Sequence, residues 1–357
     1  MRKLAAIILL ALLLTGTACA EEGLNLAQFE DTEVSFTYAN EIFWIPNDFK
    51  PYDPESANLS GFILWTMSYE GKDVLCAAWL DTGECRMYSF RAYPIQSDPE
   101  LDGVLLAEEK DGTVTLWHMD GAGNLSVLKT FEGIEPYSYL YSKTAPSNRF
   151  GYSILAYRNE CLYYCRRVDR EKAYVECIQR RADGGEYVYQ GTSSCLSESG
   201  RMAYFEKKEA DGTEMLVIES PEAGIQETGI RETQDTRIRT MCWRDDDTLL
   251  FWTRDANDTS EKPRRLFSYS VSSGTASEVL NENGEAIVCE AALFLGTICK
   301  DRYVVTSNQI AQVMDDMCGE PVVLDLQTGA YYSIVQPYNF VKRGYLSGAI
   351  PLAYMLK

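Results

Sequence analysis

The stretch LDTGECRMY at residues 80–88 decides the fold. A short polar turn ends in glycine, and a second strand-like run follows it directly. The same form returns in YSVSSG at 269–274 and in DLQTG at 325–329, where Tyr331 and Tyr332 begin the second run. Glycine suits the end of such a turn because it adopts a positive φ without steric cost. The repeated unit is therefore predicted to be a β-hairpin.

Short apolar runs of strand type fill the chain from residue 30 onward and are bounded by Gly, Asp, Asn or Ser. Many of these runs are continuous rather than alternating, which indicates strands that are covered on both faces. The clearest runs lie at 34–38, 62–65, 74–79, 114–117, 202–205, 215–218 and 249–252. Short strands at regular intervals favour a sandwich, a barrel or a propeller.

The spacing of the turn glycines favours the propeller. Weaker turns of the same kind occur at Gly123, Gly184 and Gly224, and successive turn glycines lie 40 to 61 residues apart. A four-stranded propeller blade takes about 40–50 residues. Dividing residues 21–357 by about 48 residues per blade predicts an all-β chain with a single propeller domain of about seven four-stranded blades, and six blades is the alternative.

One segment departs from the strand pattern and predicts a short helix over residues 308–318. Ser307 is a suitable N-cap and Gly319 follows the last turn. The apolar residues at helical spacing are Ile310, Val313, Met314 and Met317. Such a helix would pack its apolar stripe on its own blade or dock a partner.

A family resemblance supports the propeller. The stretch SESGRMAYF at 197–205 resembles the S-P-D-G-R-x-I-A-F strand entry of TolB-like and WD40-like propeller repeats, and WRDDDTLLF at 243–251 is similar to the entry of the next blade. The resemblance extends over residues 193–335, although Glu198 and Ser199 replace Pro and Asp and no Trp-Asp dipeptide occurs. It implies a bacterial, exported repeat protein. A propeller repeat specifies an architecture that hosts unrelated functions.

The N-terminus has the layout of a signal peptide. Arg2 and Lys3 form a basic start, residues 4–14 are apolar, and small residues precede a predicted cut after Ala20. The apolar run is too short for a resident membrane helix, and no later segment is long and apolar enough to span a bilayer. We therefore expect residues 1–20 to be removed and the chain to be extracytoplasmic, either secreted or in the cell envelope.

A lipid anchor is the alternative to simple cleavage. Ala18 directly before Cys19 resembles a bacterial lipobox, whose pattern has a branched aliphatic residue where this chain has Gly16. Simple cleavage is the favoured interpretation.

Charge and composition exclude several functions. The formal net charge of −20 repels phosphate backbones, which disfavours nucleic-acid binding. The single histidine, His118, excludes multi-histidine metal catalysis, and no G-x-S-x-G, P-loop or dinucleotide motif occurs. No catalytic residue is predicted. Paired carboxylates in the central channel remain a route to glycan hydrolysis or elimination, since the chain has 53 acidic residues.

Two sets of residues are candidate binding sites. Trp44, Phe49 and Tyr52 lie among prolines in an insertion at 44–60, where aromatic rings would suit stacking on a sugar or peptide, although ordinary loop packing is the favoured interpretation. The run Asp245, Asp246 and Asp247 is a weak candidate for a Ca²⁺ ligand set, because it lacks the spacing of an EF-hand and a solvated turn is the favoured interpretation. We otherwise expect no cofactor.

One disulfide is predicted from strand register. If residues 161–168 and 174–181 form a hairpin, Cys165 faces Cys177 and Arg166 faces Glu176. Ten cysteines remain after residue 20, and export would permit them to form disulfides. We therefore predict a Cys165–Cys177 bridge.

These observations favour a non-catalytic extracytoplasmic propeller that binds a protein, a peptide or a cell-envelope polymer. A glycan hydrolase or lyase with its site in the central channel is the alternative. The ligand, the oligomeric state and the thiol state are not determined by the sequence.

Overall fold

The computed structural model describes residues 24–30, 50–53, 59–69, 72–98, 102–134, 154–169, 174–189, 192–207, 213–220, 223–232, 236–255, 264–289, 293–300, 302–313, 316–334, 344–345 and 352–356. Within these residues all secondary structure is β-strand except one 3-10 turn, η1 (Leu26–Phe29). No helix in this part of the chain is therefore long and apolar enough to cross a membrane.

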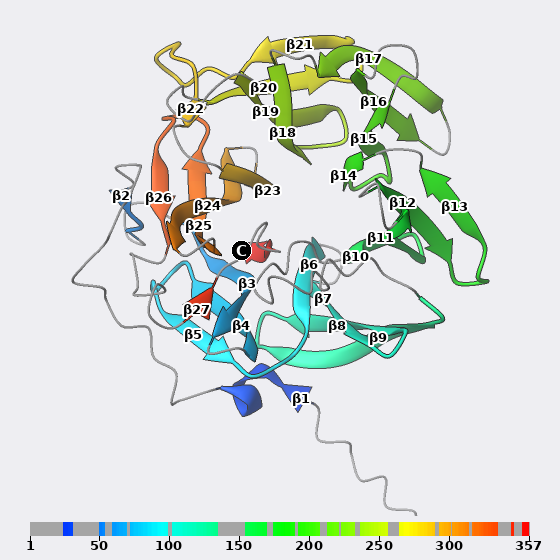
Figure 1. The fold of residues 1–357 in the computed structure, drawn as a ribbon. Coiled ribbons are helices and arrows are strands. Elements are labelled where there is room, and N and C mark those ends of the chain that lie inside the picture. The colour runs from blue at the N-terminus through cyan, green and yellow to red at the C-terminus, as the bar shows by residue number, and fades with distance from the viewer. Residues whose placement is uncertain are drawn as a thin grey trace, which may run out of the picture.

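The strands form six sheets that Figure 1 shows arranged as a ring around a central axis. The chain is therefore a six-bladed β-propeller, so the count of about seven blades is wrong and the alternative of six is confirmed. From the inner to the outer edge, blade 1 contains β28 (Leu352–Leu356), β3 (Gly61–Tyr69), β4 (Lys72–Trp79) and β5 (Cys85–Tyr88). Blade 2 contains β6 (Tyr93–Asp98), β7 (Gly103–Lys110), β8 (Thr113–Asp120) and β9 (Asn124–Glu132).

The other four blades follow the chain in the same antiparallel order. Blade 3 contains β10 (Ile154–Arg158), β11 (Cys161–Asp169), β12 (Tyr174–Arg181) and β13 (Glu186–Tyr189). Blade 4 contains β14 (Thr192–Leu196), β15 (Met202–Lys207), β16 (Glu214–Ser220) and β17 (Gly224–Glu232). Blade 5 contains β18 (Thr236–Trp243), β19 (Thr248–Asp255), β20 (Arg264–Ser270) and β21 (Thr275–Glu278), and β22 (Val288–Cys289) also pairs with β20. Blade 6 contains β23 (Leu293–Lys300), β24 (Tyr303–Val313), β25 (Asp316–Asp325) and β26 (Tyr331–Ser333).

Blade 1 is built from both ends of the chain, and this closes the ring. The C-terminal strand β28 pairs antiparallel with β3, with Leu352 opposite Trp65 and Leu356 opposite Gly61. The short strand β27 (Gly344–Tyr345) pairs with the other end of β3. Figure 1 places the C-terminus near the centre of the ring. The inner edge of β3 is thus paired, as a stable sheet edge requires.

The hydrophobic core is divided among the six interfaces between neighbouring blades. In β3, Ile63 and Trp65 pack with Val305 of blade 6. The alternate residue Leu64 faces the other way and packs with Leu106 of blade 2. Successive strand residues point to opposite faces, so a strand buried on both faces is a continuous apolar run. This confirms the interpretation of the continuous runs in the sequence.

Each blade carries one of the turn glycines between its third and fourth strands. All six have a positive φ, between 66° and 86°. They are Gly83, Gly123, Gly184, Gly224, Gly274 and Gly329. The predicted glycine hairpins are confirmed, and there is one of them per blade.

The predicted helix over 308–318 is wrong. The structure places this segment in the long hairpin of β24 and β25, where Asn308 is opposite Glu320 and Val313 is opposite Asp316. A bulge between Gln309 and Ala311 shifts the register along the ladder. The hairpin extends a β-ladder that the preceding residues already form. An isolated helix of this length is only marginally stable.

Two N-terminal segments attach to the rim of the ring. β1 (Leu24–Asn25) pairs with β9 of blade 2, and β2 (Lys50–Pro51) pairs in parallel with β26 of blade 6. Leu26 is buried in the core between blades 1 and 2. The Phe29 ring lies 5.0 Å from the ring of Phe90. Residues 24–30 therefore connect the outer parts of two blades.

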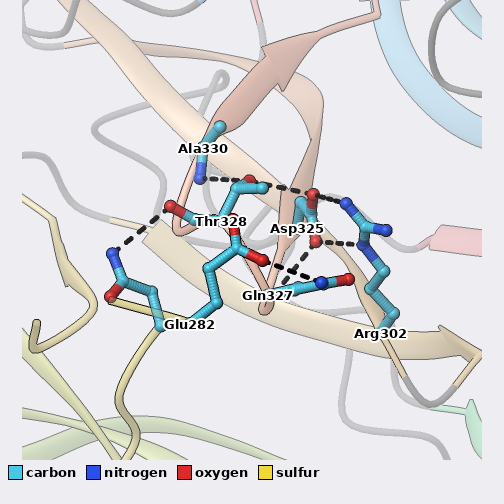
Figure 2. Close-up of polar contacts among 7 residues, drawn as sticks. Glu282, Arg302, Asp325, Gln327, Thr328 and Ala330 are labelled. Atoms are coloured by element: carbon cyan, nitrogen blue, oxygen red, sulfur yellow. Dashed lines mark hydrogen bonds and ion pairs between the residues drawn. The ribbon is translucent and has the colours of Figure 1, made fainter. Parts of the chain in front are cut away.

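Polar contacts between turns also hold blades together. Glu282 N–H donates to Gln327 O at 2.7 Å, and Gln327 Nε2 donates to Glu282 Oε2 at 2.8 Å. Figure 2 shows the side-chain contact beside the turn of blade 6. Between blades 2 and 3, the side-chain amide of Gln96 pairs with both the N–H and the C=O of Tyr157. These contacts fix neighbouring blades in position.

Candidate functional site

A groove lies between the outer strands of blades 3 and 4, with a volume of about 420 Å³. Its walls come from β12 and β13 on one side and from β16 and β17 on the other, which Figure 1 shows side by side. The lining residues are Gln179, Arg181, Glu186, Tyr187, Tyr189, Glu219, Ser220 and Gly224. The groove joins a polar rim to a floor of aromatic rings.

The β12–β13 hairpin positions two tyrosines on the groove side. Gly184 N–H donates to Arg181 O at 3.0 Å and closes the turn that begins β13. Tyr187 and Tyr189 are two residues apart in a strand and therefore point to the same face. Tyr189 is buried in the core between the blades, whereas Tyr187 is 49% exposed. The ring of Tyr189 thus forms the floor of the groove, and the ring of Tyr187 forms an accessible wall.

The tyrosine rings stand almost at right angles to one another. The centroids of Tyr187 and Tyr189 are 5.0 Å apart with an interplanar angle of 77°. Tyr189 and Tyr204, which is buried on β15, are 6.1 Å apart at 66°. Edge-to-face arrangements of this kind are favourable for aromatic pairs. Tyr187 lines the groove and stays half exposed, whereas Tyr189 and Tyr204 are buried.

A buried carboxylate sits beside these rings. Glu219, near the end of β16, is only 7% exposed. Its Oε1 accepts a hydrogen bond from Tyr187 Oη, and its Oε2 accepts one from Tyr204 Oη at 2.9 Å. A carboxylate offers about four acceptor positions, so these two phenols do not exhaust its capacity.

The phenols remain protonated donors over the ordinary pH range. The hydrogen bond to Glu219 and partial burial raise the pKa of Tyr187 to about 12. Burial, with contributions from the Glu219 carboxylate, raises the pKa of Tyr189 and Tyr204 well above the usual value. The rings therefore act as neutral hydrogen-bond donors and aromatic surfaces.

The rim carries charges of both signs. Arg181 has a side chain that is 64% exposed, and its Nε lies 3.5 Å from Asp183 Oδ1. Glu186 accepts from Arg180 Nη1 at 3.2 Å and from Tyr164 Oη at 3.0 Å. The lining residues thus supply two tyrosine rings, the carboxylates of Glu186 and Glu219, and the side-chain amide of Gln179.

Of the aromatic residues proposed from the sequence, only Tyr52 lies within the described residues. It packs against the core between blades 1 and 6, and its Oη donates to Leu80 O at 2.9 Å. Trp44 and Phe49 lie outside the described residues, as do Cys19 and Ala20. The proposed stacking site at these three aromatics therefore stays a prediction.

The three aspartates of the candidate Ca²⁺ site each serve a different turn. Asp245 accepts from the N–H groups of Asp247 and Thr248, and Asp246 accepts from the N–H of Ser199 in blade 4. The Asp247 carboxylate accepts hydrogen bonds from Ser270 and Ser272. Among the residues that the structure describes, no three His, Cys, Asp or Glu side chains are grouped as metal ligands.

The predicted register around the cysteine pair is confirmed. Cys165 lies opposite Cys177 and Arg166 lies opposite Glu176 in the β11–β12 ladder. The Cys177 side chain is buried in the core between blades 3 and 4. The disulfide itself stays a prediction.

Sequence reasoning missed the groove residues. Tyr187 and Tyr189 form a Tyr-x-Tyr pattern that begins three residues after the turn glycine Gly184. An outer blade strand usually faces solvent on at least part of its surface, so two aromatic residues on one face of it are a signal that could have been used. The sequence around Glu219 carries no comparable signal, because this residue lines a groove only through the packing of the adjacent blade.

Comparisons with known proteins extend to the fold alone. No known family model matches the chain, and no curated protein matches it either. The crystal structure of puromycin hydrolase is similar over 85% of this chain with 13% identity and a TM-score of 0.41; the chain covers 57% of that protein. The β-propeller domain of the Trilobed protease from Pyrococcus furiosus is similar over 78% of this chain and 85% of its own, with 12% identity and a TM-score of 0.37.

A protein from Lactobacillus plantarum matches 84% of this chain and 99% of its own length, at 12% identity and a TM-score of 0.38. These TM-scores add nothing to what the sheet topology already shows. The chain is therefore placed in the class of six-bladed β-propellers by its own strand pairing, and no particular family follows from the comparisons.

Proposed function

We propose that this chain is an exported, non-catalytic propeller that binds a protein, a peptide or a cell-envelope polymer, and that the groove between blades 3 and 4 is a binding site. The observation that carries the proposal is the exposed ring of Tyr187 above the buried Tyr189 and Glu219. Exposed aromatic surface beside placed polar groups is typical of recognition sites. The rigid blades hold these groups in place before a ligand arrives, which lowers the entropic cost of binding.

A binding assay with matched variants tests this proposal. The purified chain is screened against peptides and envelope polysaccharides, and each binder is then measured with Tyr187→Ala and Val127→Ala. Val127 is 55% exposed on the outer strand β9 of blade 2 and is not one of the residues that line the groove. We expect Tyr187→Ala to weaken binding about tenfold or more and Val127→Ala to leave it unchanged. Equal effects of the two substitutions on binding would exclude the groove as the binding site.

The same panel tests the alternative of glycan hydrolysis or elimination. We expect no product from any polysaccharide, and we expect EDTA to leave binding unchanged, since the proposal needs no metal. Catalytic turnover that a single Asp or Glu substitution in the central channel abolishes would contradict the non-catalytic proposal.

Export is a separate part of the proposal and has its own measurement. The basic start, apolar run and small residues up to Ala20 support removal of residues 1–20. Mass spectrometry of the chain recovered from its source should find Glu21 at the N-terminus. A diacylglyceryl-modified Cys19 would instead establish a lipid-anchored protein.

A further inference from the structure

The groove has the geometry of a site for an organic cation. The half-exposed ring of Tyr187 packs on the buried ring of Tyr189, with centroids 5.0 Å apart and planes that differ by 77°. A ring face carries negative electrostatic potential, and a cation is attracted when it lies within about 6 Å of a ring centroid. The ring of Tyr187 is the one that a cationic group in the groove can reach, and Tyr189 holds that ring in place from beneath.

The buried carboxylate supplies the opposite charge. Glu219 is 7% exposed and lines the groove, and its carboxylate accepts hydrogen bonds from the phenols of Tyr187 and Tyr204. Two phenol donors stabilise a carboxylate but leave its charge uncompensated. A buried charge is costly unless it is paired, so a cation in the groove would gain more from Glu219 than from an exposed carboxylate.

The surrounding charges do not cancel this preference. Arg181 is the cation at the rim, and its side chain extends into solvent and lies near Asp183. Glu186 adds a second carboxylate to the lining and is shared with Arg180. The whole chain has a formal charge of −20, which attracts basic macromolecules at long range. A lysine-bearing polypeptide therefore matches both the carboxylates that line the groove and the net negative charge of the whole chain.

We infer that the groove binds the alkylammonium group of a lysine side chain on a partner polypeptide, with the ring of Tyr187 as the accessible wall and Glu219 as the counter-charge. This inference rests on the proposed function and names the chemistry of its ligand. The ammonium donates to the open acceptor positions of Glu219, and its methylene stem lies on the exposed ring of Tyr187.

Charge selectivity at the groove tests the inference. The probes are Nα-acetyl-lysine amide and Nα-acetyl-norleucine amide, which differ in the ammonium group and share the apolar stem. We expect the lysine probe to bind about tenfold more tightly to the purified chain. Glu219→Gln should bring the two affinities close together, whereas Glu132→Gln, on β9 of blade 2, should leave the preference intact. A merely structural role of Glu219 would weaken both probes equally.

Two substitutions of one residue separate the ring from its hydroxyl. Tyr187→Phe keeps the ring wall and should retain the lysine preference, and Tyr187→Ala should lose it. Because Tyr187 is half exposed, both variants are expected to fold even if Glu219→Gln does not.

The outcomes distinguish this inference from the proposed function. Equal binding of the lysine and norleucine probes overturns the inference alone if other ligands still depend on Tyr187. Choline binding more tightly than the lysine probe overturns the polypeptide source of the cation. If no ligand of any kind depends on Tyr187, the proposed function fails together with the inference.

Discussion

Arg302 and Asp325 form a two-pronged ion pair in blade 6: Arg302 Nε donates to Asp325 Oδ1 at 2.6 Å and Arg302 Nη2 donates to Oδ2 (Figure 2). Asp325 is 2% exposed and also accepts from Gln327 N–H at 3.0 Å and from Thr328 Oγ1 at 2.8 Å. A buried carboxylate thus fixes the turn that contains the sixth turn glycine, and its counter-charge comes from the neighbouring hairpin end.

Removing the guanidinium group of Arg302 should destabilise the propeller. We expect Arg302→Ala to lower the free energy of unfolding by about 2 kcal/mol, because the buried carboxylate loses two charged donors. Arg86→Ala is a matched control: Arg302 lies over the ring of Tyr303 and Arg86 lies over that of Trp79, but the partner of Arg86, Glu84, is exposed. That change should cost about 0.5 kcal/mol. Urea unfolding measures both, and equal losses would contradict the role of Asp325 burial.

Acid should weaken the fold through the same carboxylates. Burial raises the pKa of Asp325, but hydrogen bonds from Arg302, Thr328 and the Gln327 backbone outweigh it and hold the pKa below its ordinary value. The hydrogen bond from Ser270 does the same for the pKa of Asp247. A carboxyl group whose pKa is lower in the folded chain than in the unfolded chain stabilises the fold at pH values above its unfolded-state pKa of about 3.9. This stabilisation is lost as the pH falls through the folded-state pKa.

The expected result is a free energy of unfolding that declines below about pH 4. Asp325→Asn should be less stable at neutral pH and should lose less on acidification. Unfolding curves recorded at several pH values from neutral to acid give both slopes. An unchanged slope in Asp325→Asn would show that this carboxylate does not contribute.

Adjacent glycines provide a test of the turn conformation. Gly184 has a φ of +86° with no atom within 4 Å of an added Cβ, so Gly184→Ala adds backbone strain and no clash. We expect it to cost about 1 kcal/mol. Gly185 does not have a positive φ, and its added Cβ meets the flexible end of Arg181, so Gly185→Ala should cost much less. Thermal unfolding distinguishes them, and the reverse order would contradict the turn geometry.

The Cys165–Cys177 bridge can be tested by alkylation. Directly opposed strand residues have Cα atoms about 4.5–5.5 Å apart, which is within the range of a disulfide. We expect both cysteines to resist alkylation until a reductant is added. Cys161→Ser is a suitable control because Cys161 lies on the same strand but opposite Arg181. Alkylation of Cys165 and Cys177 in the denatured but unreduced chain would exclude the bridge.

The number of blades shows which features of the fold can be predicted from local sequence patterns and which cannot. The turn glycines mark six hairpins because a positive φ is needed at each, and their number equals the number of blades. Dividing chain length gave about seven because it assigned residues 21–60 to blades. In the structure the first blade strand of the chain is β3, which begins at Gly61, and residues 24–25 and 50–51 only extend the rims of blades 2 and 6.

The groove depends on contacts that no local pattern contains. The hairpin register at Cys165 follows from strand pairing over a short loop, so it could be predicted. Tyr187 and Glu219 lie in different blades, and their hydrogen bond follows from the packing of two separate sheets. The helix prediction failed for a related reason, since the apolar spacing near Val313 fits a helix and only the partner strand decides between the two.

A crystal structure of the purified chain grown with Nα-acetyl-lysine amide tests the central claim most directly. We predict the ammonium group within about 6 Å of the ring centroid of Tyr187 and in hydrogen-bond contact with Glu219. Density for the probe in the central channel, with the groove between blades 3 and 4 empty, would contradict the claim.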